Sequence, residues 1–200
     1  MIYILRHGQT KLNKARVLQG ISDHPLDENG ISQAGSVGNW FEQQGISFSV
    51  IYSSPLKRAV QTAELASPGS RIQLDRRLIE LDCGPYEGVN LNSPPEELRR
   101  FFSDFIHQPA PKEMESLQEV VHRTGSFVEQ IRGLTGDILI STHAIAMKGI
   151  LEYLTPESGG SYWNQHIGNC TVYAAENEEG RIAVPKLLFT LEAGEQQEKA

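Results

Sequence analysis

Short apolar runs alternate with amphipathic stretches along most of this chain. Continuous apolar runs are typical of strands buried on both faces, whereas apolar positions spaced three and four apart indicate helices. The first pattern predicts strands at residues 2–5, 49–53, 71–74, 137–142, 171–175 and 185–189. The second pattern, with its flanking Gly, Pro and Ser signals, predicts helices at residues 32–44, 55–66, 94–105, 116–134 and 144–154.

The clearest of these helices covers residues 116–134. The positions that follow its 3.6-residue period are Leu117, Val120, Val121, Thr124, Phe127, Val128, Ile131 and Leu134. Ser116 followed three residues later by Glu119 is a capping box, which marks a helix start. The sequence therefore predicts both the beginning of this helix and the face that it buries.

The order of the elements predicts an α/β fold. Strands and helices alternate, without an internal repeat or a low-complexity linker, which indicates a mostly parallel sheet with helices on both faces. Ligands bind beyond the carboxyl ends of the strands in such sheets. The residues that follow three of the predicted strands are Arg6-His7, Lys57-Arg58 and His143. Two histidines and two arginines are therefore expected at one rim of the sheet.

The composition is typical of a soluble globular protein with one core. The chain has 200 residues, 39% hydrophobic and 22% charged, so two full-sized domains are not expected. Lys+Arg 18 against Asp+Glu 25 gives a formal charge of −7. This balance argues against nucleic-acid binding, which usually needs a basic face, but it allows a local basic pocket for an anionic small molecule.

Cysteine usage and the chain ends add expectations about compartment. Cys83 and Cys170 have neither CxxC spacing nor a histidine-rich neighbourhood, so we expect no disulfide framework and no zinc site. The apolar start of the chain stops at Arg6, which is too short for a signal peptide or a membrane helix. We therefore expect a cytoplasmic protein without a membrane partner, with residues 192–200 as a solvated tail.

Two arginines and two histidines without metal-ligand spacing describe a site for a phosphate dianion. The guanidinium fork matches phosphate oxygens, and a neutral imidazole can take a phosphoryl group covalently. The reaction also needs an acid to protonate the leaving oxygen. The candidates near one another are Glu80, Asp82 and Glu87, and periodicity alone does not choose among them.

The motifs of this chain resemble those of the histidine phosphatase superfamily, which includes the cofactor-dependent phosphoglycerate mutases. The matching segments, in chain order, are RHGQT at residues 6–10, Asn13, QGISDHPL at 19–26, SSPLKRAVQTA at 53–63, Glu80 with Gly84, Glu87 and Gly88, Glu115-Ser116, and Thr142-His143. Met114 and Ala144 stand where the family usually has glycine. Each motif alone is weak, whereas all of them in order along nearly the whole chain are specific.

The resemblance implies a fold, a mechanism and a set of site residues. The fold would be a three-layer α/β/α sandwich with a mixed, mainly parallel six-stranded sheet, in a single domain over residues 1–191. His7 would be the nucleophile that becomes phosphohistidine, and Glu80 would protonate the leaving group and then activate water. The residues expected on the phosphoryl oxygens are Arg6, Arg58 and His143. The residues expected at the substrate mouth are Thr10, Asn13, Gln19 and Gly20. The family needs no metal, and no other cofactor is expected.

The segment at residues 89–112 is where a short substrate lid would lie. Its aromatic residues Phe101, Phe102 and Phe105 could supply an apolar wall. Arg99 and Arg100 have two interpretations: they pair with Glu96 on a helix surface, or they clamp a second anion. The other side chains of interest are expected to be packed or solvated: His24, His107, His122, His166 and Cys83.

These features favour a metal-independent phosphomonoesterase that acts on a small phosphorylated metabolite. The short insert is similar to that of the phosphatase branch, in which water hydrolyses the phosphohistidine. A cofactor-dependent phosphoglycerate mutase is the alternative, and a weakly catalytic phospho-ligand-binding protein, suggested by Ala144, is the second. The length and compactness of the chain are similar to those of α-ribazole phosphatases, sugar bisphosphatases and broad-specificity phosphatases. Among these classes we rank the broad-specificity phosphatases first. The oligomeric state stays open, with a homodimer as one option.

Overall fold

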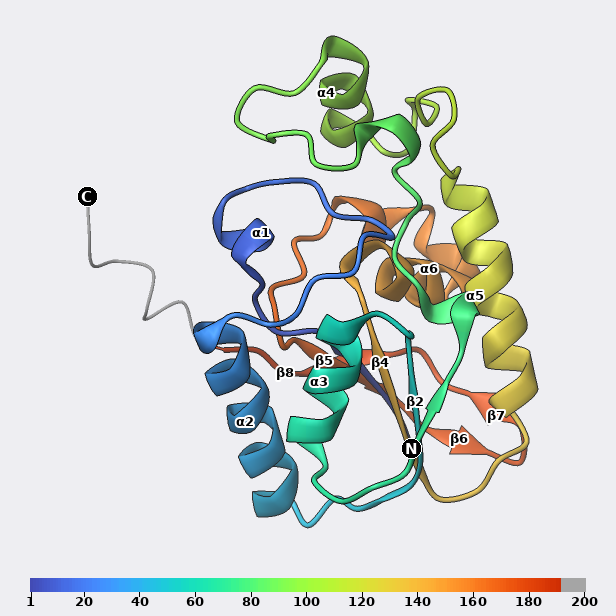
Figure 1. The fold of residues 1–200 in the computed structure, drawn as a ribbon. Coiled ribbons are helices and arrows are strands. Elements are labelled where there is room, and N and C mark those ends of the chain that lie inside the picture. Colours follow the sequence, from blue (N-terminus) through green and yellow to red (C-terminus); the bar gives the residue numbers. More distant parts are fainter. Residues whose placement is uncertain (192–200) are drawn as a thin grey trace.

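A mixed six-stranded sheet forms the centre of the computed structural model, which describes residues 1–191 (Figure 1). The strand order is β3-β2-β4-β1-β5-β8; the first four are parallel to one another, β5 is antiparallel to β1, and β8 is antiparallel to β5. The strands are β1 (Ile2–Arg6), β2 (Phe48–Ser53), β3 (Ile72–Leu74), β4 (Asp137–Thr142), β5 (Val172–Ala175) and β8 (Lys186–Phe189). The expected mixed, mainly parallel sheet is confirmed, and the expected tail at 192–200 lies outside the described residues.

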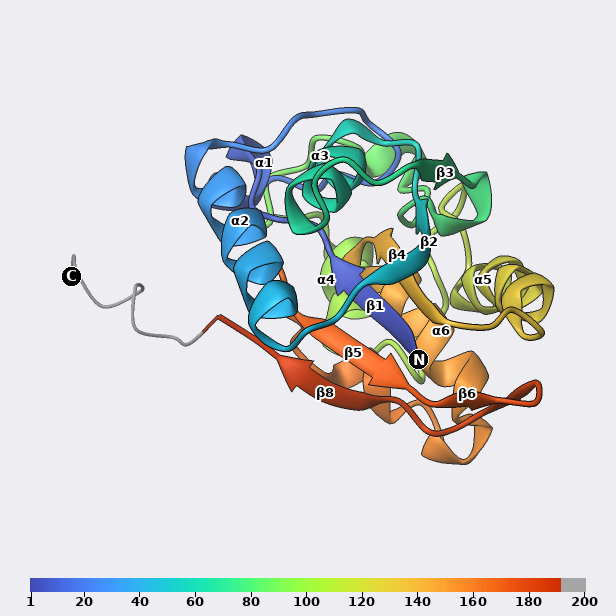
Figure 2. The same cartoon turned by 90° about the horizontal axis from the view of Figure 1, so that it is seen from below.

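Helices cover both faces of the sheet. Helices α2 (Glu28–Gln43) and α3 (Lys57–Ala66) lie on one face, and α5 (Leu117–Ile131) and α6 (Ala144–Leu154) lie on the other (Figure 2). Two short helices, α1 (Lys11–Lys14) and α4 (Glu96–Ser103), lie beyond the carboxyl ends of the parallel strands (Figure 1). The remaining elements are η1 (Arg76–Leu78), η2 (Gly84–Tyr86), η3 (Pro156–Ser158), η4 (Ser161–Asn164), β6 (Asn177–Glu178) and β7 (Arg181–Ile182). The expected three-layer arrangement is therefore confirmed.

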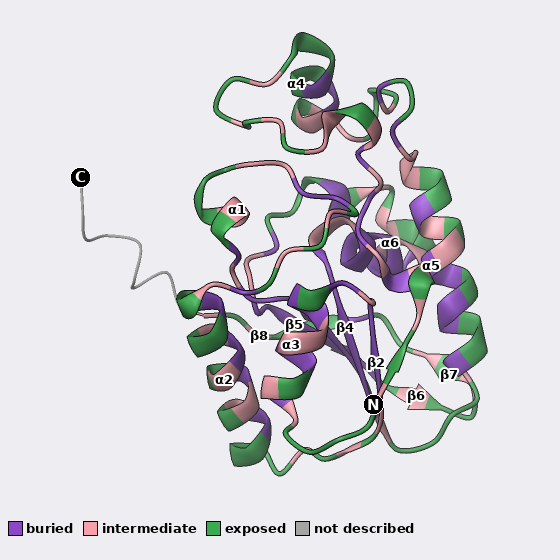
Figure 3. Ribbon diagram, in the orientation of Figure 1, coloured by how far each residue is buried: buried purple, intermediate pink, exposed green. Residues whose placement is uncertain are grey.

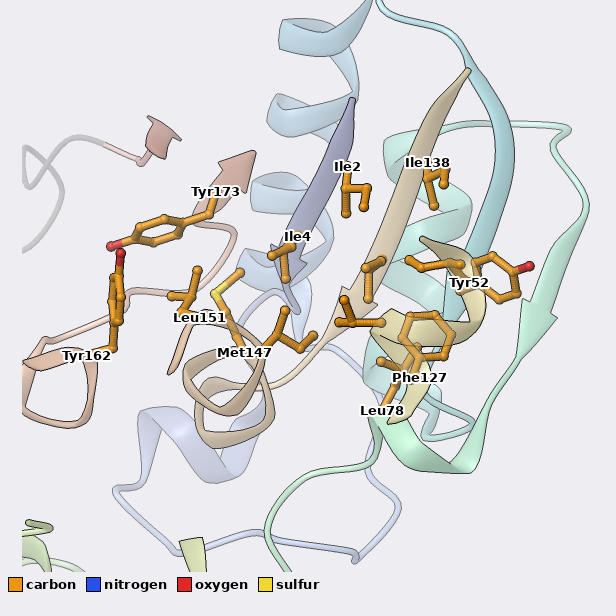
Figure 4. Close-up of a cluster of buried hydrophobic side chains, with 14 of the residues drawn as sticks. Ile2, Ile4, Tyr52, Leu78, Phe127, Ile138, Met147, Leu151, Tyr162 and Tyr173 are labelled. Atoms are coloured by element: carbon orange, nitrogen blue, oxygen red, sulfur yellow. The ribbon is translucent and has the colours of Figure 1, made fainter. Parts of the chain in front are cut away.

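The central strands are buried on both faces, which explains their unbroken apolar runs (Figure 3). Ile4 belongs to a cluster with Phe127 of α5 and Met147 of α6 (Figure 4). The next residue, Leu5, belongs to the opposite cluster, with Phe41 of α2. Successive side chains of β1 thus fill two cores, which fixes the position of this strand and of the loop that follows it.

A third apolar cluster joins residues 89–112, which we call the cap segment, to the rest of the molecule. Leu98 and Phe101 of α4 are buried in this cluster together with Leu81, Met114 and Val120. The cap segment therefore has a core contact with the segment that follows η1 and with α5. Within residues 1–191, no helix is both long enough and apolar enough to cross a membrane.

Helix α2 begins four residues earlier than its sequence pattern indicates. Its N-cap is Asp27, whose side chain accepts a hydrogen bond from the backbone N–H of Gly30 at 2.8 Å. Gly30 does not precede the helix but lies in its first turn. A Cβ atom at this position would lie 2.0 Å from the carbonyl oxygen of Gln9, so the glycine serves the close approach of the loop after β1.

Other boundaries differ by a few residues. Helix α3 begins at Lys57, two residues after Pro55, and α4 ends at Ser103. Helix α5 begins with the expected Ser116–Glu119 capping box but ends at Ile131, because the chain turns before the exposed Leu134. The sequence pattern did not predict α1, β6 or β7, which have only two to four residues each.

Candidate active site

The carboxyl ends of β1 and β4 bring two histidines together. Arg6 of β1 pairs in register with Thr142 of β4, and the backbone N–H of His7 donates to the carbonyl of Thr142 at 2.9 Å. The ring centroids of His7 and His143 are 5.0 Å apart, with an angle of 63° between the ring planes. Parallel pairing of segments that are far apart in the sequence thus creates the histidine pair.

His7 is buried in the form that a nucleophile requires. Its side chain is only 3% exposed, and Nδ1 lies 2.7 Å from the carbonyl oxygen of Gly8. A carbonyl can only accept, so Nδ1 carries the proton and Nε2 keeps its lone pair. Burial, and then the charges of Arg58 and Arg6, hold the pKa of His7 well below its usual range. The ring is therefore neutral at pH 7, with its lone pair on Nε2.

Arg58 is fully buried and holds His143 in one tautomer. Its Nε donates to Nδ1 of His143 at 3.1 Å, so Nε2 of His143 carries the proton and donates to Oγ of Ser54 at 2.7 Å. Burial, followed by the charge of Arg58, also holds the pKa of His143 well below its usual range. The Nη1 and Nη2 atoms of Arg58 donate to the carbonyls of Ser22 and Gly20, each at 2.7 Å. A guanidinium has five N–H groups, so two remain for a ligand.

The loop that holds Arg58 is itself held by Glu87. Oε1 of Glu87 accepts from the backbone N–H groups of Gly20 at 2.9 Å and Ile21 at 2.7 Å, and Oε2 accepts from the Ser22 hydroxyl at 2.8 Å. A Cβ atom on Gly20 would lie 2.2 Å from the carbonyl oxygen of Leu81, so only glycine fits here. Glu87, one of three candidate acids in the sequence, thus contacts this loop.

Glu80 lies at the N-terminal turn of α6. Its Oε1 accepts from the backbone N–H groups of Leu81 at 2.8 Å and of Ile145 and Ala146, each at 3.1 Å. The side chain is 7% exposed. The first turn of a helix stabilises negative charge, and here it fixes the carboxylate beside the histidine pair.

The backbone around Glu80 is fixed by a partly buried ion pair. Arg123 of α5 donates to Oε1 of Glu115 at 2.6 Å. It also donates to the carbonyl of Ile79 at 2.7 Å and to the carbonyl of Glu80 at 3.2 Å. Glu115 in turn accepts from the backbone N–H of Asp82 at 3.1 Å. In the Glu115-Ser116 motif, Ser116 therefore caps α5, and Glu115 fixes the segment around Glu80 through Asp82 and Arg123.

A cavity of about 480 Å³ lies between the rim of the sheet and the cap segment; the fully buried Arg58 and His143 lie outside its lining. Arg6, His7 and Glu80 line it from the side of the sheet, and Arg99 and Phe102 line it from α4. A second hollow of about 560 Å³ on the surface of α5 and α6 is mainly apolar and contains none of the motif residues. The motif chemistry therefore belongs to the cavity at the rim.

The four residues expected at the substrate mouth occupy two kinds of position. Asn13 and Gln19 line the cavity, whereas Thr10 and Gly20 do not. The Thr10 hydroxyl is the N-cap of α1 and accepts from the backbone N–H of Asn13 at 3.1 Å and from Nε2 of Gln19 at 2.7 Å. Oε1 of Gln19 and Nε of Arg6 are buried and have no partner among residues 1–191, which leaves both atoms for a ligand.

The cavity also contains residues that the sequence did not assign to it. Arg16 lines the cavity. The only signal for this in the sequence is its position between Asn13 and Gln19. Of the two arginines on α4, Arg99 lines the cavity, whereas Arg100 lines a separate hollow of the cap segment. Ala144 and Ile145 line it from the start of α6.

The remaining titratable candidates lie outside the cavity lining. Cys83 is buried, and burial raises the pKa of its thiol far above the usual range, which makes it unreactive. His107, His122 and His166 are exposed, and His24 is half-buried. Across residues 1–191, no group of three or more His, Cys, Asp or Glu side chains is placed to hold a metal ion.

Comparisons with known proteins agree with this geometry. A family model described as the histidine phosphatase superfamily (branch 1) matches residues 2–189. Phosphoserine phosphatase 1 of Hydrogenobacter thermophilus is 26% identical over an alignment of 201 residues, covering 97% of this chain and 94% of the relative. "Probable phosphoglycerate mutase GpmB" of Escherichia coli O1:K1 is 30% identical over 185 residues, covering 89% and 85%. The crystal structure of Entamoeba histolytica phosphoserine phosphatase with 3-phosphoglyceric acid has a TM-score of 0.80, with 24% identity over 94% of this chain and 96% of that chain.

Proposed function

The chain belongs to branch 1 of the histidine phosphatase superfamily, as its motifs led us to expect, and we propose that it is a metal-independent phosphomonoesterase for a small phosphorylated metabolite. The observation that carries this proposal is the buried, neutral ring of His7, whose Nε2 keeps its lone pair at a cavity that Arg6 and Glu80 also line. A neutral imidazole beside fixed cations is suited to attack phosphorus rather than to exchange protons with water.

The guanidinium groups bind the phosphoryl oxygens in this proposal. Arg58 offers its two remaining N–H groups from a fixed, buried position, and Arg6 offers its unpartnered Nε. His143 holds Arg58 through Nδ1 and adds its own dipole to the same region. Donors that are fixed before the substrate arrives stabilise the charge of the transition state without reorganising.

The reaction proceeds in two halves. In the first, Nε2 of His7 forms a bond to phosphorus, the bond from phosphorus to the ester oxygen breaks, and the protonated Glu80 gives its proton to that oxygen. In the second, water attacks the phosphohistidine, the carboxylate of Glu80 takes a proton from the water, and the phosphorus–nitrogen bond breaks. Inorganic phosphate leaves, and His7 returns to its neutral form.

The other predicted residues have supporting roles in this proposal. Asn13 and Gln19 contact the substrate from the cavity wall, whereas Thr10 positions both of them as the cap of α1. Gly20 acts through its carbonyl, which holds Arg58. The cap segment serves as the lid, because α4 supplies the outer wall of the cavity.

The decisive experiment is phosphate release from a panel of metabolites in EDTA, comparing the wild-type protein with His7→Ala. The panel contains sugar phosphates, nucleotides, 3-phosphoglycerate, α-ribazole phosphate and p-nitrophenyl phosphate. We expect release that survives EDTA, an acid-labile phosphohistidine in the wild type, and a loss of at least about 10³-fold in His7→Ala. The exposed His122→Ala is the matched control. Activity that persists in His7→Ala, or that EDTA removes, contradicts the proposal.

A phosphoglycerate mutase is the second candidate, favoured by the 30% identity to the relative named GpmB. A mutase returns the phosphoryl group to the glycerate before water reaches it. Interconversion of 2- and 3-phosphoglycerate that depends on bisphosphoglycerate and exceeds phosphate release would establish the mutase instead. Absence of both activities and of phosphohistidine would favour a phospho-ligand-binding protein.

A further inference from the structure

The cavity has more positive charge than a phosphate site needs. Arg6, Arg16 and Arg99 line it against one acidic side chain, Glu80, although the whole chain has a formal charge of −7. Arg6 and the buried Arg58 are already assigned to the phosphoryl group. We propose that Arg16 and Arg99 form a second anion subsite, so that the preferred substrate is a small phosphate monoester with a further anionic group. This inference rests on the proposed function for the position of the phosphoryl group.

Arg16 follows the C-terminus of α1, is exposed, and lines the cavity from a backbone conformation that is unfavourable for its residue type. Its φ of +53° lies in the left-handed region, which favours glycine over residues with a Cβ atom. The carbonyl of Arg16 accepts from the backbone N–H of Leu91 at 2.7 Å, and its own N–H donates to the carbonyl of Asn13 at 3.0 Å. Its guanidinium makes no hydrogen bond or ion pair with the other residues of the described range. An arginine in a glycine-like conformation, with a free guanidinium at a cavity wall, indicates a role for its side chain.

Arg99 can turn to a ligand without leaving a carboxylate unpaired. Its Nη2 lies 2.7 Å from Oε2 of Glu96, while Nε of Arg100 lies 2.9 Å from Oε1 of the same glutamate. Both pairs are exposed, and such pairs contribute little to stability. Glu96 therefore keeps Arg100 as a partner when Arg99 binds a substrate anion.

The rest of the cavity lining suits a small, partly apolar linker. Phe102, Leu91 and Pro94 line the same cavity as the two arginines. A volume of about 480 Å³ accommodates a metabolite rather than a macromolecule. A guanidinium fork binds either a carboxylate or a phosphate in a bidentate manner, so the shared chemistry is a second oxyanion.

Matched substrate pairs test this subsite. The first pair is 3-phosphoglycerate and glycerol 3-phosphate, which differ by a carboxylate; the second is fructose 1,6-bisphosphate and fructose 6-phosphate, which differ by a phosphate. We expect kcat/KM of the wild-type protein to favour the doubly anionic member of at least one pair by tenfold or more. The pair with the larger ratio identifies the second anion. Ratios near one in both pairs would overturn the proposal.

Three variants locate the effect. Arg16→Gly suits the left-handed backbone, and Arg99→Met keeps the apolar stem of the side chain without the guanidinium. Each should lower the ratio within the favoured pair at least fivefold, mainly through KM of the doubly anionic substrate. The control is Arg71→Met, which removes the same charge from an exposed position outside the cavity lining and should leave the ratio unchanged. A ratio that survives in Arg16→Gly and Arg99→Met, or that falls equally in Arg71→Met, contradicts the assignment.

A binding measurement separates failure of this subsite from failure of the proposed function. Calorimetry on the His7→Ala protein with the same four compounds does not need turnover. If no ester is hydrolysed but the doubly anionic compounds still bind more tightly, and Arg99→Met removes the difference, the subsite stands and the phosphatase does not. Equal binding within both pairs, with hydrolysis intact, overturns the subsite alone.

Discussion

Glu80 meets two demands at the scale of a single residue. Three backbone N–H groups, two of them from the first turn of α6, bind its Oε1, which fixes the position of the carboxylate. The proposed reaction also requires the same group to carry a proton to the leaving oxygen. The proposed reaction therefore requires the carboxylate to keep this position while it exchanges a proton with the substrate.

Glu80→Gln separates these demands. Glutamine keeps an acceptor oxygen for the helix terminus but cannot deliver the proton. We expect kcat/KM for an alkyl phosphate such as glycerol 3-phosphate to fall by about 10²–10⁴-fold, whereas p-nitrophenyl phosphate should lose much less, because nitrophenolate leaves without a proton. The two substrates are compared in one assay, and an exposed substitution, Glu64→Gln, is the control. Equal losses for both substrates would show that Glu80 does not act as the acid.

Cavity residues that belong to a sequence motif could be predicted from the sequence. Cavity residues that reach the site only through the folding of a loop could not. Arg6 and His7 stand at the end of β1, so topology brings them to the rim, whereas Glu80 follows η1 and only the family resemblance chose it among three acids. Arg16 reaches the cavity only because its left-handed backbone and the hydrogen bond to Leu91 hold the chain against the cap segment. That contact joins residues 75 positions apart, and no local pattern encodes it.

At the scale of elements, the loop at residues 20–22 connects Glu87 to Arg58. Glu87 holds the loop through two backbone N–H groups and one hydroxyl, and two carbonyls of the same loop hold the guanidinium of Arg58. Neither Glu87 nor Arg58 lines the cavity, and the loop links the two side chains, so we expect Glu87 to act as a positioning residue for Arg58. A displacement of about 1 Å at such a group can cost roughly 10²-fold in rate.

Glu87→Ala should therefore lower kcat by about 10²-fold with a smaller change in KM, because it loosens Arg58 without removing it. A double-mutant cycle with Arg58→Ala provides the critical comparison. If Glu87 acts through Arg58, its substitution has almost no further effect on kcat once Arg58 is absent. Glu87→Gln, which retains an acceptor for the two N–H groups, should recover part of the rate. Additive losses in the cycle would assign Glu87 to general stability instead.

Element boundaries were predictable where a local signal determined them. The capping box at Ser116 set the start of α5 as expected, because both of its bonds lie within four residues. The pattern predicts that α2 begins after Gly30, whereas Gly30 lies in its first turn, where it allows the close approach of Gln9. Helix α1 contains only one turn, and Thr10, which the family resemblance places at the substrate mouth, is its N-cap and lies outside the cavity lining. A glycine can mark a helix boundary or allow a close contact with a distant segment, and a Thr can cap a helix or contact a ligand. The sequence alone does not distinguish these roles.

At the scale of the whole molecule, the fold buries two neutral histidines in its interior. His7 and His143 are 3% and 0% exposed, and burial followed by the charge of Arg58 lowers the pKa of both. Below their usual pKa of about 6.5, the unfolded chain binds protons that the folded protein does not bind. The contribution of these groups to stability is therefore complete above pH 6.5 and is lost progressively as the pH falls below it.

The free energy of unfolding should consequently decrease between pH 6.5 and 5 by up to roughly 1.4 kcal/mol per pH unit for each histidine. Carboxylates with lowered pKa values, such as Asp75 and Glu119, act in the same direction but nearer pH 4, so this window isolates the histidines. Calorimetry from pH 7.5 to 5 should show Tm falling by several degrees per pH unit in the wild type and about half as steeply in His7→Gln. The exposed His122→Gln should keep the wild-type slope, because its ring is in water in both states. A His7→Gln slope equal to that of the wild type would mean that His7 is already protonated in the folded protein, and the proposed neutral nucleophile would fail with it.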